Sequence, residues 1–280
     1  MDHSAMSTLL TCARKYEYLY RYRKAEEQVS NALRGGTFWH KILEQHADHG
    51  FCDVDELAQK LQWQDPPDDY RTLAKYRRAY AIWRETVAPQ YRFLDAEFSF
   101  TRPVDGTDEP AEGRIDGLVE WDANQGTGVE RWILDAKTTG RLESNWVQTY
   151  RLSDQFQLYI YEARQRGLGV AGTVVDVFHC TKGNKSGKTD GEREGIRFYQ
   201  LPIRYDQRRI DEVLQTFRAA DALVKGFTAA GYFPPNRSAC KMYNRTCGFA
   251  DLCDTSDPTL RADLLKALPD NTFSPHTTDD

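Results

Sequence analysis

Two alternating apolar runs, separated by a short polar turn, constrain the fold of this chain more than any other feature. Residues 112–121 (EGRIDGLVEW) and 129–138 (VERWILDAKT) have strand patterns, and the segment DANQGTG between them has the composition of a turn. Such a pair forms an antiparallel hairpin. Side chains two apart on a strand share a face, so Asp135 and Lys137 project together, and Asp116 can face the same space. The hairpin therefore predicts two carboxylates and an ammonium group above one face of a sheet.

Helical and strand patterns surround this hairpin on both sides. The patterns predict helices over 6–24, 37–49, 68–88, 152–166, 206–229 and 258–267, and further strands over 95–102, 172–180 and 196–203. Gly35-Gly36 marks the expected start of the second helix, and Pro89 the end of the third. We expect a mixed α/β fold in which helices flank a central mixed sheet. The expected domains are residues 1–253, with a helical insertion at 25–95, and an acidic tail at 254–280.

The composition describes an ordinary globular chain without a membrane segment. Its 280 residues carry a net charge of −5, which does not by itself indicate nucleic-acid binding. No apolar run approaches the ~20 residues that span a bilayer, and the start MDHSAMSTLL lacks the pattern of a signal peptide. We therefore expect a cytoplasmic location, where disulfides are disfavoured. The six cysteines then need another explanation.

Two basic segments are candidates for DNA contact. Arg14 and Lys15 lie in the segment 13–24 (ARKYEYLYRYRK), where basic residues alternate with tyrosines. Basic groups neutralise phosphates and aromatic rings stack on bases, although the same pattern fits a tyrosine-rich helix packed on a core. The loop 181–195 carries Lys182, Lys185 and Lys188 among glycines. This loop is either a phosphate-backbone contact or a solvated hairpin tip.

The residues grouped on the hairpin suit hydrolysis of a phosphodiester. Two carboxylates bind a hard divalent cation through oxygen. The cation can polarise the phosphodiester and lower the pKa of a bound water, while Lys137 orients that water or steadies developing charge. Glu97, within the expected strand 95–102, could add a carboxylate, and His40 an imidazole ligand. Glu44, one helical turn after His40, could orient it.

Each of these residues also has an ordinary structural interpretation. An Asp-x-Lys triplet occurs routinely on surface strands, and an isolated histidine such as His40 is more often structural. Glu97 alone would be a surface acid in most proteins, and the nearby Asp95 competes for its role. The chemistry is therefore carried by the combination of these residues and not by any one of them.

The cysteines suggest a second site. Cys240, Cys247 and Cys253 are close in sequence near the end of the chain, and Cys12 is near its start. Four thiolates suffice for a [4Fe–4S] cluster or a tetrahedral zinc, but the C-x₂-C knuckles usual in zinc sites are missing. Spacing alone favours free buried thiols. The remaining two cysteines, Cys52 and Cys180, match no pattern and are expected to be ordinary buried cysteines.

Several separated segments, in one order, resemble the PD-(D/E)XK nuclease superfamily and specifically its RecB-like branch, which includes CRISPR adaptation nucleases and phage exonucleases. They are 35–44 (GGTFWHKILE), 113–120 (GRIDGLVE), 133–139 (ILDAKTT) and 155–159 (QFQLY), and the resemblance extends from about residue 7 to 253. It implies that His40, Glu97, Asp116 and Asp135 bind metal and that Lys137 is the catalytic lysine. It also implies that Gln155 and Tyr159 contact DNA or support the site, although Tyr159 could equally pack in the core. Leu134 stands where the family often has proline.

The segments STLLTCARKYEY and SACKMYNRTCGFADLC resemble the split cysteine set of iron–sulfur members of this branch. This resemblance implies that Cys12, Cys240, Cys247 and Cys253 hold a [4Fe–4S] cluster that joins the two ends of the chain in a cysteine-bound subdomain. The cluster would be structural or would position DNA.

The function implied is that of a Mg²⁺- or Mn²⁺-dependent deoxyribonuclease, an exonuclease that prefers single-stranded DNA ends. Its context would be recombination, repair, phage DNA metabolism or CRISPR adaptation. No G-x-x-x-x-G-K-[ST] loop is present in the sequence, so a motor would have to come from a partner helicase or a recombination or adaptation protein. The alternative is a catalytically weak iron–sulfur protein of the same fold that binds DNA as a scaffold.

Overall fold

The computed structural model describes residues 1–25, 30–123, 126, 128–183, 186–187, 189–242 and 245–271. The chain divides into two compact units that alternate along the sequence. Unit 1 comprises Met1–Val29, Ser99–Gly113 and Asp211–Asp280, and unit 2 comprises Ser30–Phe98 and Arg114–Ile210. The expected boundary between a domain at 1–253 and a tail stays a prediction. Within the described residues, every helix is too short or too polar to cross a membrane.

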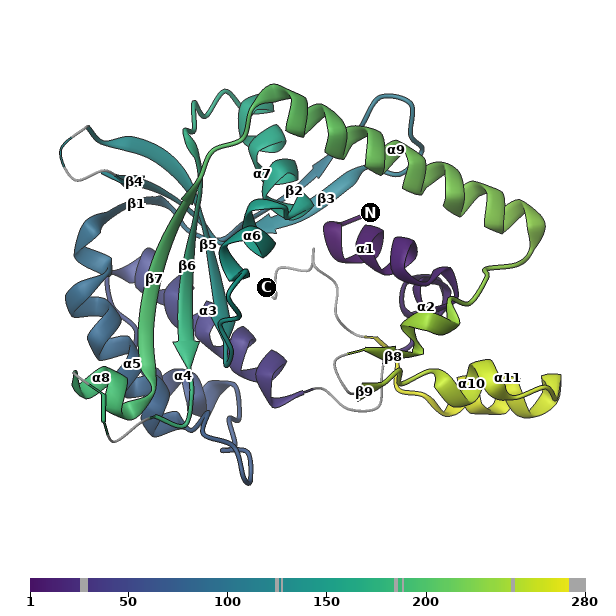
Figure 1. The fold of residues 1–280 in the computed structure, drawn as a ribbon, viewed down its shortest axis with the longest axis horizontal. Helices are drawn as coiled ribbons and strands as arrows, with labels where there is room; N and C mark the ends of the chain where they lie inside the picture. Colours follow the sequence, from purple (N-terminus) through teal and green to yellow (C-terminus); the bar gives the residue numbers. More distant parts are fainter. Residues whose placement is uncertain are drawn as a thin grey trace. The chain divides into compact units, whose positions relative to one another are not determined.

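Unit 2 is built on a five-stranded mixed sheet. Its strands have the order β1-β4-β5-β6-β7, and Figure 1 shows them twisting together. The parallel pair is β5 with β6, and the other neighbours are antiparallel. The bounds are β1 Tyr91–Asp95, β4 Gly117–Trp121, β5 Glu130–Thr139, β6 Gly172–Cys180 and β7 Ile196–Ile203. This arrangement confirms the predicted central mixed sheet.

Helices cover both faces of this sheet. The helices α3 (Asn31–His49), α4 (Val54–Lys60) and α5 (Leu73–Thr86) pack against one face. Their fully buried Trp39 and Trp83 join Trp132 and Phe178 of the strands in one hydrophobic core. On the opposite face lie α6 (Trp146–Arg151) and α7 (Asp154–Gln165), and the short α8 (Asp190–Glu194) precedes β7 (Figure 1). Burial of large aromatic side chains on both faces fixes which side each strand residue takes.

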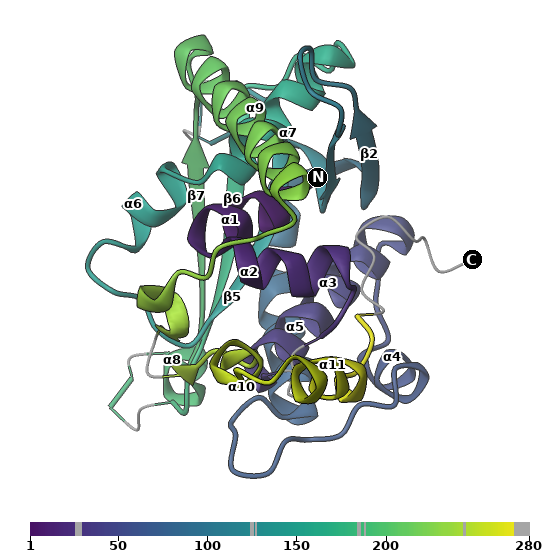
Figure 2. The ribbon, with the colours of Figure 1, turned by 90° about the vertical axis from the view of Figure 1, so that its right-hand side faces the viewer.

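Unit 1 brings the start and the end of the chain together. It holds α1 (His3–Thr11), α2 (Ala13–Tyr16), the π-helical turn η1 (Glu17–Arg21), most of the two-stranded sheet of β2 (Phe98–Arg102) and β3 (Ala111–Ile115), most of α9 (Gln207–Ala230), η3 (Arg237–Cys240), β8 (Lys241–Met242), β9 (Arg245–Thr246), α10 (Ala250–Asp254) and α11 (Pro258–Ala267). Figure 2 shows α1 and α2 beside the C-terminal helices. The backbone N–H of Arg14 donates to Pro234 O at 3.2 Å, and Arg14 Nε donates to Phe233 O at 2.7 Å.

The predicted start of the helix at 37–49 is wrong. The helix α3 begins at Asn31, because Ser30 caps it and accepts a hydrogen bond from the backbone N–H of Leu33. Gly35 lies inside the helix and not before it. A Cβ at Gly35 would fall far inside the van der Waals contact of the Tyr76 hydroxyl. The glycine is therefore required for close packing of α3 on α5 and not as a helix breaker.

Two predicted strands also differ from the structure. The run 112–121 is divided at Asp116, because β3 pairs with β2 whereas β4 pairs with β1 and β5. The predicted strand 95–102 begins only at Phe98, and the residues before it belong to β1 and a connection. Glu97 is therefore not a strand residue, because the chain leaves one sheet and enters another at this point.

The predicted helix over 6–24 is interrupted at Cys12. This residue has an extended backbone, with φ −159° and ψ 105°, and it separates α1 from α2. The strands β6 and β7 and the helix α11 have the predicted bounds, and α9 agrees within a residue at each end. The helices α4 and α6 and the strand β1 were not predicted. Residues 272–280 of the predicted acidic tail lie outside the described residues.

Candidate active site

Asp116 lies where one strand pairing ends and another begins. The last described pair of β4 with β5 joins Gly117 and Leu134. Just beyond it, the backbone N–H of Ala136 donates to Asp116 Oδ2 at 2.8 Å. His40 Nδ1, from α3, lies 3.2 Å from the same oxygen. The carboxylate of Asp116 thus connects α3 to the central strand of the sheet.

Asp135 and Lys137 of β5 form the second half of the site. Asp135 is 1% exposed, and its Oδ2 lies 2.7 Å from Lys137 Nζ. From α7, Gln155 Nε2 donates to Asp135 Oδ1 at 3.4 Å and to Tyr159 Oη at 2.6 Å. The ammonium group of Lys137 also lies 5.7 Å from the centre of the Phe156 ring. The structure therefore brings together Asp116, Asp135, Lys137, His40, Gln155 and Tyr159, all within unit 2.

Burial and mutual charge set the protonation of these groups in opposite directions. Burial raises the pKa of Asp135 to about 6, and the negative charge of Asp116 adds to this rise while Lys137 opposes it. Burial acts in the same way on Asp116, but the charge and hydrogen bond of His40, with help from Lys137, outweigh it and lower its pKa. Burial alone would lower the pKa of Lys137 and of His40, yet the neighbouring carboxylates raise both. Two acids that repel each other beside a held ammonium group favour binding of a further cation.

Glu97 and Glu44 approach the same site from the side. Glu97 Oε1 lies 3.2 Å from Arg114 Nη1 and 3.9 Å from Lys41 Nζ, and Lys41 Nζ lies 2.7 Å from Glu44 Oε2. Burial raises the pKa of Glu97, and Arg114 opposes the rise. The two glutamates border a cavity of about 10 Å³, room for one water-sized particle, whose polar lining is His40, Glu44, Glu97 and Asp116.

The donor set fits a hard divalent cation in chemistry, although its carboxylate oxygens also have contacts within the protein. Among the described residues, no group of three or more His, Cys, Asp or Glu side chains converges as metal ligands do. Asp116 Oδ2 contacts His40 and Ala136 N–H, and Asp135 Oδ2 contacts Lys137. That Asp135 oxygen is buried, and its contact with Lys137 is an ion pair that lacks hydrogen-bond geometry. Carboxylate oxygens are suitable ligands for Mg²⁺ or Mn²⁺.

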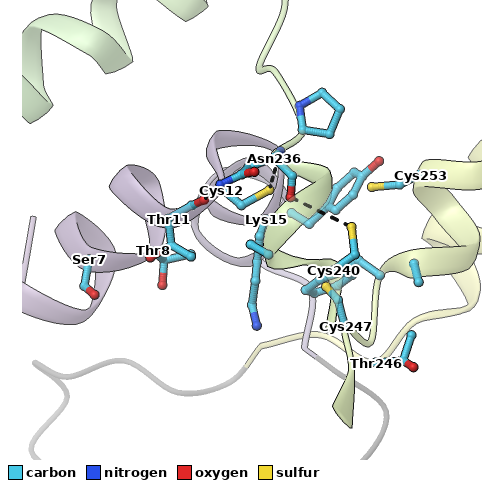
Figure 3. A pocket seen from close by; sticks show the side chains of 15 residues that line it. Ser7, Thr8, Thr11, Cys12, Lys15, Asn236, Cys240, Thr246, Cys247 and Cys253 are labelled. Carbon is cyan, nitrogen blue, oxygen red and sulfur yellow. Dashed lines mark hydrogen bonds between the residues drawn. The ribbon is translucent and has the colours of Figure 1, made fainter. Parts of the chain in front are cut away.

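The four predicted cluster cysteines line one cavity of unit 1. Its volume is about 280 Å³, and Figure 3 shows the sulfur atoms of Cys12, Cys240, Cys247 and Cys253 around it. All six cysteines are free thiols. Burial raises the pKa of Cys253, and the neighbouring thiols of Cys12, Cys247 and Cys240 act in the same direction. The four thiols are thus close enough to affect one another's charge, although no metal-binding group of three or more side chains is formed among the described residues.

Packing and hydrogen bonds hold this cysteine cavity at the junction of the two chain ends. Asn236 donates from its backbone N–H to Cys12 Sγ at 3.3 Å and from its side chain to Thr11 O at 2.8 Å. The backbone N–H of Cys247 donates to Cys240 O at 2.8 Å. Cys247 and Cys253 pack against a small core of Tyr18, Phe249 and Leu252. The break in the helix at Cys12 and the turns after residue 236 therefore direct the thiols to one place.

The predicted DNA-contact residues outside the site have varied positions. Arg14 has its guanidinium 5.1 Å from the centre of the Tyr232 ring, and it also lies 3.5 Å from Glu17. Lys15 lines the cysteine cavity (Figure 3). Lys182 is exposed after β6, whereas Lys185 and Lys188 lie outside the described residues. The predicted roles of these residues in DNA contact stay predictions.

Three residues of the site were missed by the sequence analysis. Arg114 and Lys41 hold Glu97. Burial raises the pKa of Tyr150, while the charge of Lys137 opposes the rise and that of Asp135 adds to it. A signal existed for the first two. Arg114 stands two residues before Asp116, and Lys41 directly follows His40. Tyr150 had no such signal, because the helix α6 that carries it was not predicted.

A mixed sheet that presents two acids and a lysine beside a helix with histidine is the arrangement expected of a nuclease core. The model of the PD-(D/E)XK nuclease superfamily matches residues 2–254, and the chain belongs to this superfamily. This result confirms the predicted superfamily and fold class. The RecB-like branch within it stays a prediction.

The comparisons with solved structures agree with the fold. A protein from Eubacterium rectale, described as a candidate exonuclease, has a TM-score of 0.53 and 13% sequence identity, over 91% of this chain and 92% of that chain. At this identity the likeness shows the fold alone. The structure of SSO0001 aligns with a TM-score of 0.28 and 13% identity over 67% of this chain and 84% of that chain, which is too low to carry an argument. No match was found among curated proteins.

Proposed function

We propose that this protein is a metal-dependent deoxyribonuclease whose catalytic residues are Asp116, Asp135 and Lys137. The observation that carries the proposal is the contact of Lys137 Nζ with Asp135 Oδ2 at 2.7 Å, beside an Asp116 carboxylate that is tied to the same strand through Ala136 N–H at 2.8 Å. Membership of a nuclease superfamily supports it. His40 and Glu97 are the further candidate metal ligands, because both border the small cavity beside Asp116.

The residues of the chain have separate tasks in this proposal. Asp116 and Asp135, with His40 and Glu97, would hold Mg²⁺ or Mn²⁺, which when bound supplies Lewis-acid chemistry and lowers the pKa of a bound water. Lys137 stays protonated because the carboxylates raise its pKa. It can therefore donate a hydrogen bond to the attacking water or to a phosphate oxygen. Gln155 and Tyr159 orient Asp135 through the hydrogen bonds at 3.4 and 2.6 Å.

The test is a cleavage assay on end-labelled DNA with Mg²⁺ or Mn²⁺ and with chelator. We expect cleavage by the native chain that chelator abolishes. Asp135→Ala and Lys137→Ala should each reduce the rate by about 10²- to 10⁴-fold. Asp48→Ala is the matched control, because Asp48 is an exposed acid of α3. If the native chain binds DNA but cleaves none with either metal, and Asp135→Ala behaves as the native chain does, the protein is instead a binding or scaffolding member of the fold.

The finer activity that we propose is that of an exonuclease that prefers single-stranded ends. Its support is the similarity of the sequence motifs to the RecB-like branch and the likeness of the fold to a candidate exonuclease. Substrates blocked at the 5′ or the 3′ end, in single- and double-stranded form, test this point. Cleavage of a circular single strand at the rate of a linear one would contradict it. A helicase or a recombination or adaptation protein remains the proposed partner, because the sequence has no motor motif.

We also propose that Cys12, Cys240, Cys247 and Cys253 hold a [4Fe–4S] cluster. Its support is the gathering of four free thiols around a cavity of about 280 Å³, with Cys253 within electrostatic reach of the other three. Four thiolate ligands suffice for such a cluster. The cluster would join the first helices of the chain to the segment after α9, both of which belong to unit 1.

Anaerobic purification followed by iron, sulfide and zinc analysis tests this proposal. We expect a brown protein whose iron is lost in Cys253→Ser. Cys52→Ser is the control, because Cys52 is buried in unit 2 and its thiol donates to Gln45 Oε1 at 3.3 Å. A colourless protein that contains zinc instead of iron, or neither metal, would overturn the assignment.

A further inference from the structure

A cavity bordered by arginines lies in unit 2, outside the candidate active site. Its volume is about 340 Å³. It opens where β7 ends and α9 begins, and it includes the last residue of α6. The side chains at its border are Arg151, Pro202, Ile203, Arg204, Tyr205, Asp206 and Arg209. Three guanidinium groups thus face a single carboxylate.

Two of the three arginines show how this cavity could hold an anion: Arg204 is fixed by its neighbours, and Arg151 keeps capacity for an anion. Arg204 lies 4.7 Å from the centre of the buried Trp132 ring, and its Nη1 donates to Glu130 Oε1 at 3.2 Å. Both partners of that ion pair are about half exposed, so it is weak and can be exchanged for another anion. Among the described residues, Arg151 has no ion-pair partner. The stacking on Trp132 therefore fixes one planar guanidinium beside another that is uncommitted.

The single acid of the cavity is already engaged. Asp206 Oδ1 accepts a hydrogen bond from the backbone N–H of Arg209 at 3.0 Å, which is how a side chain caps a helix at its start. Its carboxylate therefore neutralises the first turn of α9 and leaves the guanidinium groups dominant. Planar guanidinium groups bind phosphate oxygens in pairs, which is the geometry that phosphate recognition favours.

Tyrosines connect this cavity to the candidate active site. Tyr205, which lines the cavity, donates from its hydroxyl to Tyr150 O at 3.3 Å. The centre of the Tyr150 ring lies 6.4 Å from that of Phe156, and the centre of the Phe156 ring lies 5.7 Å from Lys137 Nζ. A strand whose scissile phosphate sits at Lys137 would therefore pass close to the arginines with another of its phosphates.

We propose that Arg151, Arg204 and Arg209 form a binding site for a phosphodiester of the substrate strand other than the one that is cleaved. This proposal rests on the proposed nuclease function, and it names the part of the chain that holds the strand beside the reaction. The ligand is one phosphate, because the three cations border a single cavity.

Equilibrium binding of a labelled single-stranded oligonucleotide in chelator tests the site without catalysis. We expect Arg151→Ala and Arg209→Ala each to weaken binding by about fivefold. For single strands, the slope of log K against log salt changes by about 0.7 for each phosphate contact that is lost. If both arginines bind one phosphate, the double variant should lose about 0.7 and not about 1.4 from that slope.

Matched variants and a free anion separate this site from general charge effects. Arg208→Ala removes an arginine of the same helical turn that does not border the cavity, and it should leave the slope unchanged. Native affinity and slope in both cavity variants, in a protein that cleaves DNA, would overturn the proposed site and leave the nuclease function intact. Inorganic phosphate is also tested as an inhibitor of DNA cleavage by the native chain and the cavity variants. If the variants lose this inhibition but keep native affinity for DNA, the cavity binds free phosphate, and the proposed strand-binding site is overturned. Absence of DNA cleavage by the native chain would instead refute the nuclease function.

Discussion

Asp176→Asn should stabilise unit 2 at neutral pH. Asp176 is 2% exposed on β6, on the face of the sheet that α5 covers, and it forms no ion pair with any cation in the part of the chain that the structure describes. Its carboxylate accepts hydrogen bonds from Trp83 Nε1 at 2.7 Å and Gln200 Nε2 at 3.2 Å. Asparagine has nearly the same shape. Its oxygen can accept from Trp83, and its amide can donate to Gln200 once the Gln200 amide turns over.

The size of the effect follows from the pKa of Asp176. Burial raises this pKa from 3.8 to about 6, although the hydrogen bonds from Trp83 and Gln200 oppose the rise. Between these two values the folded state binds more protons than the unfolded state, so stability falls as pH rises through this window. Above it, the ionised carboxylate costs roughly 3 kcal/mol at about 1.4 kcal/mol for each pKa unit. At pH 5 the same linkage leaves a cost of only about 1.6 kcal/mol.

Chemical unfolding followed by tryptophan fluorescence measures this difference in unit 2. All six tryptophans of the chain lie in unit 2, so the signal reports on unit 2 and not on unit 1, which holds the four predicted cluster cysteines. The gain in free energy of unfolding of Asp176→Asn should be roughly halved between pH 7.5 and pH 5. Asp48→Asn, an exposed change in the same unit, should show no gain at either pH. A gain of equal size at both pH values, or a loss at pH 7.5, would refute the reasoning.

Three further predictions concern packing and the site. Gly35→Ala should destabilise unit 2 by about 1–3 kcal/mol, because its Cβ would collide with the hydroxyl of the buried Tyr76. Gly36→Ala, whose Cβ would lie 3.2 Å from Thr138 Oγ1, should cost less in the same unfolding measurement, because alanine favours a helix. Gln155→Ala should weaken metal affinity by about 10- to 100-fold in a metal titration of cleavage, because it removes the group that orients Asp135. Excess chelator should abolish cleavage, and added Mg²⁺ or Mn²⁺ should restore it.

The sequence analysis succeeded where burial repeats with the period of the element. The strands β6 and β7 were predicted with their observed bounds, because their apolar runs are bounded by turns. It failed where a tertiary contact overrides a local rule. Gly35 suggested a helix start, yet it lies within α3 because Tyr76 needs the space of a missing side chain. Only the packed structure contains that information.

The site residues were predictable in kind, but not in how they meet. Asp135 and Lys137 follow from the period of a strand, and their contact at 2.7 Å agrees with that rule. The engagement of Glu97 by Arg114 and Lys41 depends on the connection between β1 and β2, which appears in the sequence as a continuous strand. The distances between sequence-remote groups follow from the topology of the sheet and not from local pattern.

The break at Asp116 explains why an acid at this position can act with Asp135. Had β3 and β4 formed one continuous strand, the N–H groups of the next strand would have met backbone carbonyl groups. The pairing of β4 with β5 instead stops at Gly117 and Leu134, and the backbone N–H of Ala136 donates a hydrogen bond to the carboxylate of Asp116. The side chain therefore occupies the place of a missing backbone acceptor, and the acid is fixed one residue away from Asp135. A change that extended the pairing beyond Gly117 would complete the sheet and, by the same step, remove the anchor of this carboxylate.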